Sequence, residues 1–259
     1  MQDKISIVLT GTILPNSVLT AHADSETRRQ EYLQAIRFYT QFAPVYFLEN
    51  SSYPLDEDKE FTAIPNLFIR KMPVSLFYQK GKGFQEFEMI DNWLLQEQKL
   101  PERWIKVSGR YLYDNFESIY IECSEDNQHE LIIDQLFYEK YAFSVLFCIS
   151  TKYYLKYFKG LYTHSDDLSG NYIEKVIFKT VVSLDDNMIR IFRGQPSVKV
   201  TSGSTNKYID STNKTLLYKL ESNVRSKSIL KNKKYIFHNL SYRFSRAFIY
   251  KILMKFTTK

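Results

Sequence analysis

Three short segments that lie far apart in the chain combine small, turn-permissive residues with hydroxyl groups or cations. They are Gln79–Gly83, Lys106–Tyr111 and Thr201–Thr205. Glycine lets a backbone approach a ligand closely, while lysine, arginine, serine and backbone N–H groups satisfy phosphate oxygens. Each segment borders an apolar run, so together they predict a site for a nucleotide-diphosphate ligand.

The elements that would position these segments alternate between strand and helix. The first half of the sequence predicts strands at Ile5–Leu9, Pro44–Leu48, Asn66–Arg70 and Trp104–Val107, with helices at Ser25–Phe42 and Gln85–Gln96. The second half predicts strands near Ile119–Cys123, Glu130–Asp134 and Ala142–Ser150, with helices at Thr151–Phe158 and Asn171–Val182. Such alternation is typical of an α/β domain with a mostly parallel sheet.

Polar residues follow three of the predicted strands at their carboxyl ends. These are Thr10-Gly11, Glu49-Asn50 and Gly109-Arg110. In open α/β sheets, ligands bind beyond the carboxyl ends of the strands. The coincidence predicts a nucleotide site at that edge.

The composition describes a chain that folds around a core. It has 259 residues, of which 44% are apolar and 16% aromatic, which excludes intrinsic disorder. The net charge is +6, but residues 222–259 hold ten Lys/Arg and no Asp/Glu, so the other residues sum to −4. The basic character therefore belongs to the tail, and no nucleic-acid surface is expected on the body.

An ordered set of motifs resembles a group of small bacterial glycosyltransferases that are encoded among capsule, O-antigen and lipopolysaccharide-core genes. The matching residues are Val8–Ile13, Arg28, Tyr32, Glu49–Tyr53, Lys80–Glu86, Lys106–Tyr111, Gly170–Lys175, Arg193-Gly194 and Ser202–Thr205. The resemblance covers about residues 4–210. It implies a GT-A-like, Rossmann-related domain, which we place at residues 1–220, that transfers a sugar from a nucleotide-sugar donor to a glycan or lipid-linked acceptor.

Three other functions stay open as alternatives. One is a nucleotide-binding protein of a polysaccharide locus that is non-catalytic or transfers a nucleotidyl group. Another is a scaffold that recruits polysaccharide enzymes. An NAD-type oxidoreductase is disfavoured, because only Gly11 follows the first strand where a dinucleotide fingerprint needs three glycines.

The predicted donor-binding set collects the strand ends, the three segments and one further motif. It consists of Thr10, Gly11, Glu49, Asn50, Lys80, Gly81, Gly83, Gly109, Arg110, Arg193, Ser202, Gly203, Ser204 and Thr205. Lys80, Lys82 and Arg110 are the candidate ligands of the diphosphate, because its negative charge must be neutralised when it leaves. A solvated loop is the alternative for the two lysines, and a surface turn for the serines.

An inverting transfer needs a carboxylate that takes the proton of the acceptor hydroxyl. The candidates are Asp91, Glu174 and Glu86. Asp91 and Glu174 lie among apolar residues, where partial burial would raise the pKa of a carboxyl group and suit it to act as a base. Structural hydrogen bonding is the alternative for each.

No cofactor other than the donor is assigned, and no divalent metal is predicted. The Asp-x-Asp motif of many GT-A enzymes is absent, and Asp166-Asp167 and Asp185-Asp186 are interpreted as solvated loops. A single aspartate such as Asp134 could still hold a metal together with phosphate and water. Cys123 and Cys148 lie in apolar runs and are expected to be buried, reduced thiols.

The tail, residues 221–259, is predicted to be a basic amphipathic helix. Leu240, Phe244, Phe248 and Ile252 repeat every four residues, which makes one apolar stripe. Such a helix would bind the inner face of the cytoplasmic membrane, or it would dock on the body. With no signal peptide and no apolar run long enough to span a bilayer, a cytoplasmic, peripheral protein is expected.

Overall fold

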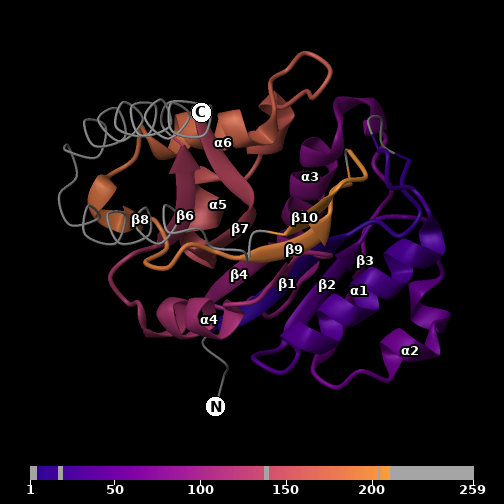
Figure 1. The fold of residues 1–259 in the computed structure, drawn as a ribbon. Coiled ribbons are helices and arrows are strands. Elements are labelled where there is room, and N and C mark those ends of the chain that lie inside the picture. The colour runs from indigo at the N-terminus through magenta and orange to yellow at the C-terminus, as the bar shows by residue number, and fades with distance from the viewer. Residues whose placement is uncertain (1–4, 17–19, 137–139, 204, 211–259) are drawn as a thin grey trace, which may run out of the picture.

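The computed structural model describes residues 5–16, 20–136, 140–203 and 205–210. These residues form a seven-stranded sheet in the order β3-β2-β1-β4-β7-β6-β8 and a smaller sheet in the order β10-β9-β5 (Figure 1). The predicted tail and its apolar stripe lie outside the described residues, and so do residues 211–220 of the predicted domain.

The main sheet contains four neighbouring parallel strands, β3-β2-β1-β4. Its strands are β1 (Ile5–Gly11), β2 (Val45–Glu49), β3 (Leu67–Lys71), β4 (Arg103–Ser108), β6 (Leu131–Leu136), β7 (Tyr141–Ser150) and β8 (Ile189–Arg190). β1 pairs in parallel with β2 and β4, β2 with β3, and β6 with β8, whereas β7 runs antiparallel to β4 and β6. The predicted α/β fold with a mostly parallel sheet is therefore confirmed.

Helices cover both faces of this sheet (Figure 1). The helices are α1 (Ser25–Tyr39), α2 (Lys59–Thr62), α3 (Lys82–Gln96), α4 (Phe116–Glu125), α5 (Thr151–Tyr157) and α6 (Ile173–Val181). One apolar core packs α1, α2 and α4 against the sheet, and a second packs α3, α5 and α6 against the other face. Alternate residues of β1 supply the two cores, Ile7 and Leu9 to one and Val8 to the other.

The smaller sheet brings the end of the described chain back over the domain. β9 (Val198–Thr201) pairs antiparallel with β5 (Leu112–Tyr113) and with β10 (Tyr208–Asp210). The backbone N–H groups of Ala21 and His22 donate to the carbonyl oxygen of Gly203, at 3.0 and 3.3 Å. The β9–β10 turn is thereby joined to the loop that precedes α1.

One predicted strand is wrong. Residues 119–123 belong to α4, not to a strand. The buried residues of α4 are Phe116, Ile119 and Cys123, which follow one another at spacings of three and four residues and so face the core from one side of a helix. The other predicted strands and helices are present, with ends that shift by a few residues.

Candidate functional site

A cavity of about 540 Å³ opens at the carboxyl ends of β1 and β4. Its walls come from those two strands, α1, the start of α3, the middle of β7, the start of α6 and the β9–β10 turn. Among the predicted site residues, those that line it are Thr10, Gly11, Gly83, Glu86, Gly109, Arg110, Glu174, Ser202 and Gly203. The edge of the sheet chosen from the sequence is the edge that holds the cavity.

Parts of all three segments that first suggested a phosphate site meet here. Lys82-Gly83, Ser108–Arg110 and Ser202-Gly203 all line the cavity. A methyl group placed on Gly203 would lie 3.0 Å from Arg110 Nη2 and 3.9 Å from Lys82 Nζ. Glycine at position 203 therefore leaves room for a ligand or for the two cations themselves.

Three cationic side chains lie in the cavity wall: Arg28, Lys82 and Arg110. Arg28 donates to the carbonyl oxygen of Thr12 and to Tyr32 Oη, and Arg110 donates to Glu31 Oε2 at 2.6 Å. Burial lowers the pKa of Lys82 to about 8, and the nearby arginines act in the same direction. An anion entering the cavity would be attracted by all three.

Glu86 and Lys106 form a buried ion pair beneath these cations. Glu86 Oε1 accepts hydrogen bonds from Thr10 Oγ1 at 2.5 Å, Lys106 Nζ at 2.7 Å and Ser108 Oγ at 3.0 Å. Lys106 is fully buried and also donates to Ser108 Oγ and to the carbonyl oxygen of Ser144. Burial lowers the pKa of Lys106, and Glu86 opposes that shift. One oxygen of Glu86 is therefore fully occupied by donors of the protein.

Glu174 is a second carboxylate in the cavity, in the first turn of α6. Its Oε1 accepts one side-chain hydrogen bond, from Ser144 Oγ at 2.7 Å. Burial raises the pKa of Glu174, and the bond from Ser144 opposes this in part. A carboxylate with a raised pKa beside open space is suited to accept a proton.

The start of α3 is already capped by the protein itself. Gly81 has φ = +100°, and a methyl group there would collide with the Asp167 carboxylate. Asp167 Oδ2 accepts from the backbone N–H of Lys82 at 3.0 Å. The glycine thus serves the approach of Asp167, and the anion at this helix N-terminus is a side chain.

Asp167 was interpreted from the sequence as a solvated loop residue, and that interpretation is wrong. It lines the cavity and is only partly exposed, and burial raises the pKa of its carboxyl group. Lys80, in contrast, does not line the cavity. Its Nζ lies 3.9 Å from Asp166 Oδ2 with the side chain 37% exposed, which matches the solvated-loop alternative.

Asp91 is buried, but it lies outside the cavity. Its two oxygens accept hydrogen bonds from Tyr154 Oη at 2.8 Å and from the backbone N–H of Gly160 at 2.7 Å. The placement corrects the prediction of a catalytic Asp91. This carboxylate ties α3 to α5 and to the turn that follows α5.

Glu49 and Asn50 also lie behind the cavity wall instead of in it. Glu49 is fully buried, and its Oε1 accepts from the backbone N–H groups of Ile13 and Ser51. Asn50 Oδ1 accepts from Thr12 Oγ1 at 2.7 Å. Both side chains hold the loop that follows β1, so their predicted contact with the donor is corrected to support of this loop, whose Thr12 lines the cavity.

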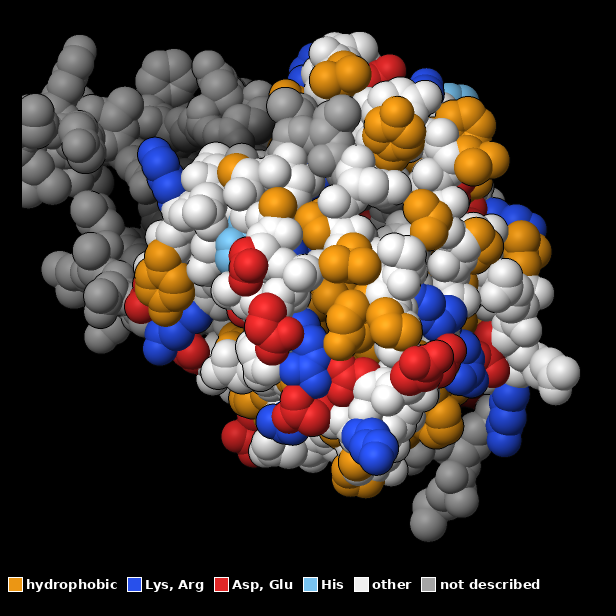
Figure 2. All heavy atoms as spheres, turned by 90° about the vertical axis from the view of Figure 1, so that its right-hand side faces the viewer, with side chains coloured by type: hydrophobic (Ala, Val, Ile, Leu, Met, Phe, Trp, Pro, Cys, Tyr) orange, Lys and Arg blue, Asp and Glu red, His pale blue; other side chains and the backbone are white. Residues whose placement is uncertain are grey.

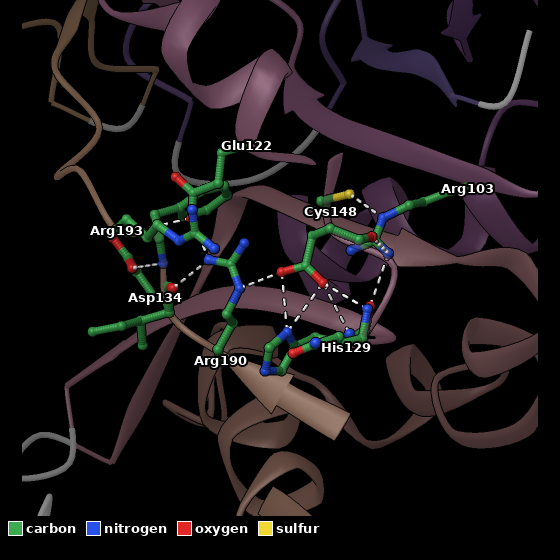
Figure 3. Close-up of polar contacts among 11 residues, drawn as sticks. Arg103, Glu122, His129, Asp134, Cys148, Arg190 and Arg193 are labelled. Carbon is green, nitrogen blue, oxygen red and sulfur yellow. Dashed lines mark hydrogen bonds and ion pairs between the residues drawn. The ribbon is translucent and has the colours of Figure 1, made fainter. Parts of the chain in front are cut away.

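Arg193 belongs to a different cluster, shown in Figure 3. Its backbone N–H donates to Glu122 Oε1 at 2.9 Å. Glu122 also pairs with Arg190, whose Nε donates to Asp126 Oδ2 at 2.5 Å. This cluster joins α4 to β8 and contains none of the residues that line the cavity, so a donor contact by Arg193 is not supported.

Three other side chains considered from the sequence lie in or beside this cluster. Asp134 is buried and accepts from the backbone N–H of Phe192 at 3.2 Å. Cys148 is buried and accepts from Arg103 Nε at 2.9 Å (Figure 3), and Cys123 is buried as expected.

Two of the remaining predicted residues lie at the β9–β10 turn, and Gly81 precedes α3. Ser204 is outside the described residues. Thr205 is exposed, and its backbone N–H donates to Ser202 Oγ at 3.3 Å. Thr205 and Gly81 therefore shape the loops beside the cavity without lining it.

Several residues that line the cavity or hold its walls are absent from the predicted donor-binding and catalytic sets. They are Arg28, Glu31, Lys106, Ser144 and Asp167. A signal was present for Lys106, which is a lysine inside an otherwise apolar strand. A fully buried lysine is almost always paired with a carboxylate.

Within the described ranges, no group of three or more His, Cys, Asp and Glu side chains is arranged to hold a metal ion. None of the described helices combines the length and the apolar character needed to cross a membrane.

No protein-family model matches the sequence, and no curated protein matches it. Among solved structures, the chain is similar to the glycosyltransferase GlyE of Streptococcus pneumoniae, with 10% identity and a TM-score of 0.43 over 72% of this chain and 44% of that one. It is also similar to mouse xyloside xylosyltransferase 1, with 9% identity and a TM-score of 0.42 over 73% and 85%. A third is the inositol-1-phosphate CTP transferase from T. maritima, with 13% identity and a TM-score of 0.41 over 88% and 97%. The chain spans less than half of the pneumococcal protein, and these neighbours comprise both glycosyltransferases and a nucleotidyltransferase.

Proposed function

We propose that this protein is a glycosyltransferase that moves a sugar from a nucleotide-sugar donor to an acceptor hydroxyl. The observation that carries the proposal is the convergence of Arg28, Lys82 and Arg110 on one cavity that also holds the carboxylate of Glu174. Cations suit a diphosphate, and a carboxylate of raised pKa suits the proton of an acceptor.

The cations act on the leaving group. When the bond between the anomeric carbon and the β-phosphate oxygen breaks, negative charge develops on the nucleoside diphosphate. Arg28, Lys82 and Arg110 stabilise that charge. Their attraction for it is strong because the surroundings of these side chains are partly closed to water. Lys82, with its pKa near 8, becomes more fully charged when an anion binds beside it.

Glu174 acts on the acceptor in an inverting transfer. Its carboxylate takes the proton of the acceptor hydroxyl while the oxygen of that hydroxyl attacks the anomeric carbon. Ser144 orients Glu174 by its hydrogen bond, and the Glu86–Lys106 pair keeps the wall beneath the cations in place. Glu86, whose Oε1 is occupied by three donors, is assigned to positioning.

The acceptor is proposed from the resemblance of the motifs. It is a cell-surface glycan or a lipid-linked intermediate of capsule or lipopolysaccharide synthesis, reached at the inner face of the cytoplasmic membrane. The Lys/Arg-rich tail is the proposed membrane contact of the full chain.

Donor binding tests the proposal directly. Thermal shift with a panel of nucleotide sugars, free nucleotides and nucleoside triphosphates should give one stabilising nucleotide sugar, by about 2.7 kcal/mol at 100 times its dissociation constant. Arg110→Ala should abolish that stabilisation and lower sugar transfer by about 10²–10³-fold, as for loss of one electrostatic stabiliser. Arg37→Ala is the matched control, since Arg37 is 56% exposed on α1 and does not line this cavity.

Two outcomes would count against sugar transfer. Stabilisation by a nucleoside triphosphate, with release of pyrophosphate from a sugar 1-phosphate, would assign nucleotidyl transfer instead. Equal donor binding by the Arg110 and Arg37 variants would remove the cation cluster from the site.

A further inference from the structure

A histidine, a glutamate and an arginine form a hydrogen-bonded series that ends in the cavity wall. Glu31 Oε2 accepts from His22 Nε2 at 2.9 Å and from Arg110 Nη1 at 2.6 Å. The side chains of His22 and Arg110 are only 9% and 8% exposed, and that of Glu31 is 24% exposed. We call these three residues the His22 relay. Arg110 lines the cavity, and the other two residues lie behind it.

The His22 relay joins segments that are far apart in the sequence. His22 lies in the loop before α1, Glu31 lies on α1, and Arg110 lies between β4 and β5. His22 Nδ1 is 3.0 Å from Asn206 Oδ1, and Arg110 Nη1 donates to the carbonyl oxygen of Thr201 at 3.3 Å. Both ends of the relay therefore hold the β9–β10 turn, which forms part of the cavity wall.

Both ring nitrogens of His22 face oxygen atoms. The carboxylate of Glu31 can only accept a hydrogen bond, and Asn206 turns its amide oxygen to the ring. A histidine between two acceptors carries a proton on each nitrogen, so this arrangement suits the charged imidazolium. A half-turn of the Asn206 amide would present its amino group to an unprotonated Nδ1 instead. The site can therefore hold either protonation state of His22.

The charged groups around His22 come from the elements packed against it. They are Glu31, Arg28 and Asp24 of α1 and its N-cap, Arg110 of the β4–β5 loop and Lys207 of the β9–β10 turn. Arg28 donates to the backbone carbonyl of His22 and not to its ring, and Asp24 and Lys207 are exposed to solvent. Glu31 contacts both the ring of His22 and Arg110, so it couples the two.

Ion pairs on the outer face of α1 differ from this relay because they lie in water. Figure 2 shows cationic and anionic side chains intermixed on the face turned to the viewer, where α1 and α2 lie (Figure 1). Arg37 pairs there with Glu60 at 3.4 Å, and each of these side chains is at least 50% exposed. Water and salt weaken such pairs, whereas the His22 relay is largely shielded. A change of charge on His22 is therefore transmitted to Arg110.

An anion in the cavity would change the balance of charge at Glu31. Without an anion, Arg110 neutralises this carboxylate. Once a phosphate or sulfate group binds Arg110, the guanidinium is shared between two anions, and the carboxylate repels the ligand. A proton on His22 supplies the missing positive charge. Anion binding and protonation should then favour each other by the same factor, since coupling between two binding events is reciprocal.

We propose that His22 and Glu31 are positioning residues for Arg110, and that binding of an anion in the cavity is coupled to uptake of one proton by His22. The proton comes from solvent, forms a bond to Nδ1, and returns to solvent when the anion leaves. The identification of the anion as the donor's diphosphate rests on the proposed function. The coupling itself requires only an anion.

Inorganic sulfate is a suitable probe, because it keeps both negative charges across the neutral range and leaves titration to the protein. Its dissociation constant from the full-length chain is measured by NMR titration at constant ionic strength between about pH 5 and about pH 8, where histidine changes charge. The dissociation constant should rise about three- to tenfold over this range, because one linked proton changes affinity by at most about tenfold per pH unit.

His22→Gln should abolish most of this rise, since glutamine can still donate to Glu31 but does not titrate. Lys82 adds its own pH dependence, because its pKa is lowered to about 8 and a bound anion favours its charged form. That part remains in His22→Gln, so the difference from the wild type isolates His22. His164→Gln is the matched control and should keep the wild-type profile, because His164 is exposed at the end of the turn Leu161–His164.

Asn206→Asp tests the other side of the ring. A carboxylate accepts from a protonated Nδ1 but has no amino group to offer a neutral ring, so the charged form of His22 is favoured. The rise in the sulfate dissociation constant should therefore move to higher pH. Asn206 is exposed and has φ = +53°, a conformation that aspartate tolerates, so this variant should fold.

Three results would overturn the inference. One is the same pH profile in the wild type and in His22→Gln. Another is an Asn206→Asp profile that is not displaced, which also decides the matter if His22→Gln does not fold. The third is equal sulfate binding by Arg110→Ala, which would identify an adventitious ion only, away from the His22 relay. Because the probe contains no sugar, a protein that shows the coupling but binds no nucleotide sugar would refute the proposed function alone.

Discussion

Lys106→Met should destabilise this protein more than any surface lysine substitution. Lys106 is fully buried and donates three hydrogen bonds, to Glu86 Oε1, Ser108 Oγ and the carbonyl oxygen of Ser144, at 2.7, 2.9 and 2.7 Å. Methionine fills a similar volume but leaves the Glu86 carboxylate without its counter-charge. Breaking a buried pair in this way typically costs about 3–5 kcal/mol.

The lower end of that range is expected here. The side chain of Glu86 keeps 19% of its surface exposed, so water from the cavity can hydrate its charge once Lys106 is gone. Thr10 and Ser108 also continue to donate to Oε1. We therefore expect a loss of about 3 kcal/mol in the free energy of unfolding.

A double-mutant cycle isolates the pair. Glu86→Gln alone should cost about 2 kcal/mol, and the double variant about 3, so that the coupling is about 2 kcal/mol. Lys152→Met is the matched control, because Lys152 pairs with Glu130 at 2.6 Å but is 79% exposed, and exposed pairs contribute at most about 1 kcal/mol.

Urea unfolding followed by tryptophan fluorescence and by circular dichroism gives these free energies where the two transitions coincide. Additive single and double variants, or an equal loss in Lys152→Met, would refute the view that burial makes the Glu86–Lys106 pair important.

Sugar transfer should rise with pH through a pKa above the ordinary glutamate value of about 4.3, because burial raises the pKa of Glu174 and the reaction needs its ionised form; Glu174→Gln should remove that limb of the pH–rate profile. Stability should fall on acidification from about pH 4 toward pH 2, because the hydrogen bond from Arg29 lowers the pKa of Asp58 to about 2 in the folded state, below its unfolded value of about 3.9. That contribution is present above the unfolded pKa and is lost as the pH falls; Asp58→Asn should flatten this part of a melting temperature–pH curve. Gly109→Ala should lower the melting temperature and donor binding together, because the added methyl group would lie 2.6 Å from the carbonyl oxygen of Thr10, a backbone atom that cannot turn away.

Sequence reasoning succeeded where short-range pattern and the geometry of parallel sheets sufficed. Thr10 and Gly109 could be placed at one edge because β1 and β4 are parallel neighbours whose carboxyl ends must coincide. Arg110 and Ser202 line the same cavity although they are far apart in the sequence. Arg110 also donates a hydrogen bond of 3.3 Å to the carbonyl oxygen of Thr201, which lies 91 residues further along the chain. The shared chemistry of their segments, hydroxyl groups and cations beside glycine, was the signal that joined them.

Sequence patterns did not predict the role of a polar residue where that role depends on its hydrogen-bond partner. Asp91 has the buried, apolar setting expected of a tuned carboxylate, yet Tyr154 and Gly160 occupy both of its oxygens. Glu49 ends a strand at the correct edge, but its side chain is turned to the backbone of the loop behind the cavity. Those partners are remote in sequence or belong to the backbone, so no local pattern announces them.

Ser144 shows how the two carboxylates of the cavity receive different roles from one residue. Its carbonyl oxygen accepts from Lys106, the lysine that also donates to Glu86, while its hydroxyl donates to Glu174. Ser144 lies in β7, the neighbour of β4, so this strand places a backbone acceptor next to Lys106 and a side-chain donor next to Glu174. Glu86 Oε1 accepts from three side-chain donors, whereas the side-chain donor to Glu174 is Ser144 alone among the described contacts. The proposed division between a positioning and a proton-accepting carboxylate therefore rests on hydrogen-bond partners that are remote in the sequence, which neither residue type nor spacing could assign.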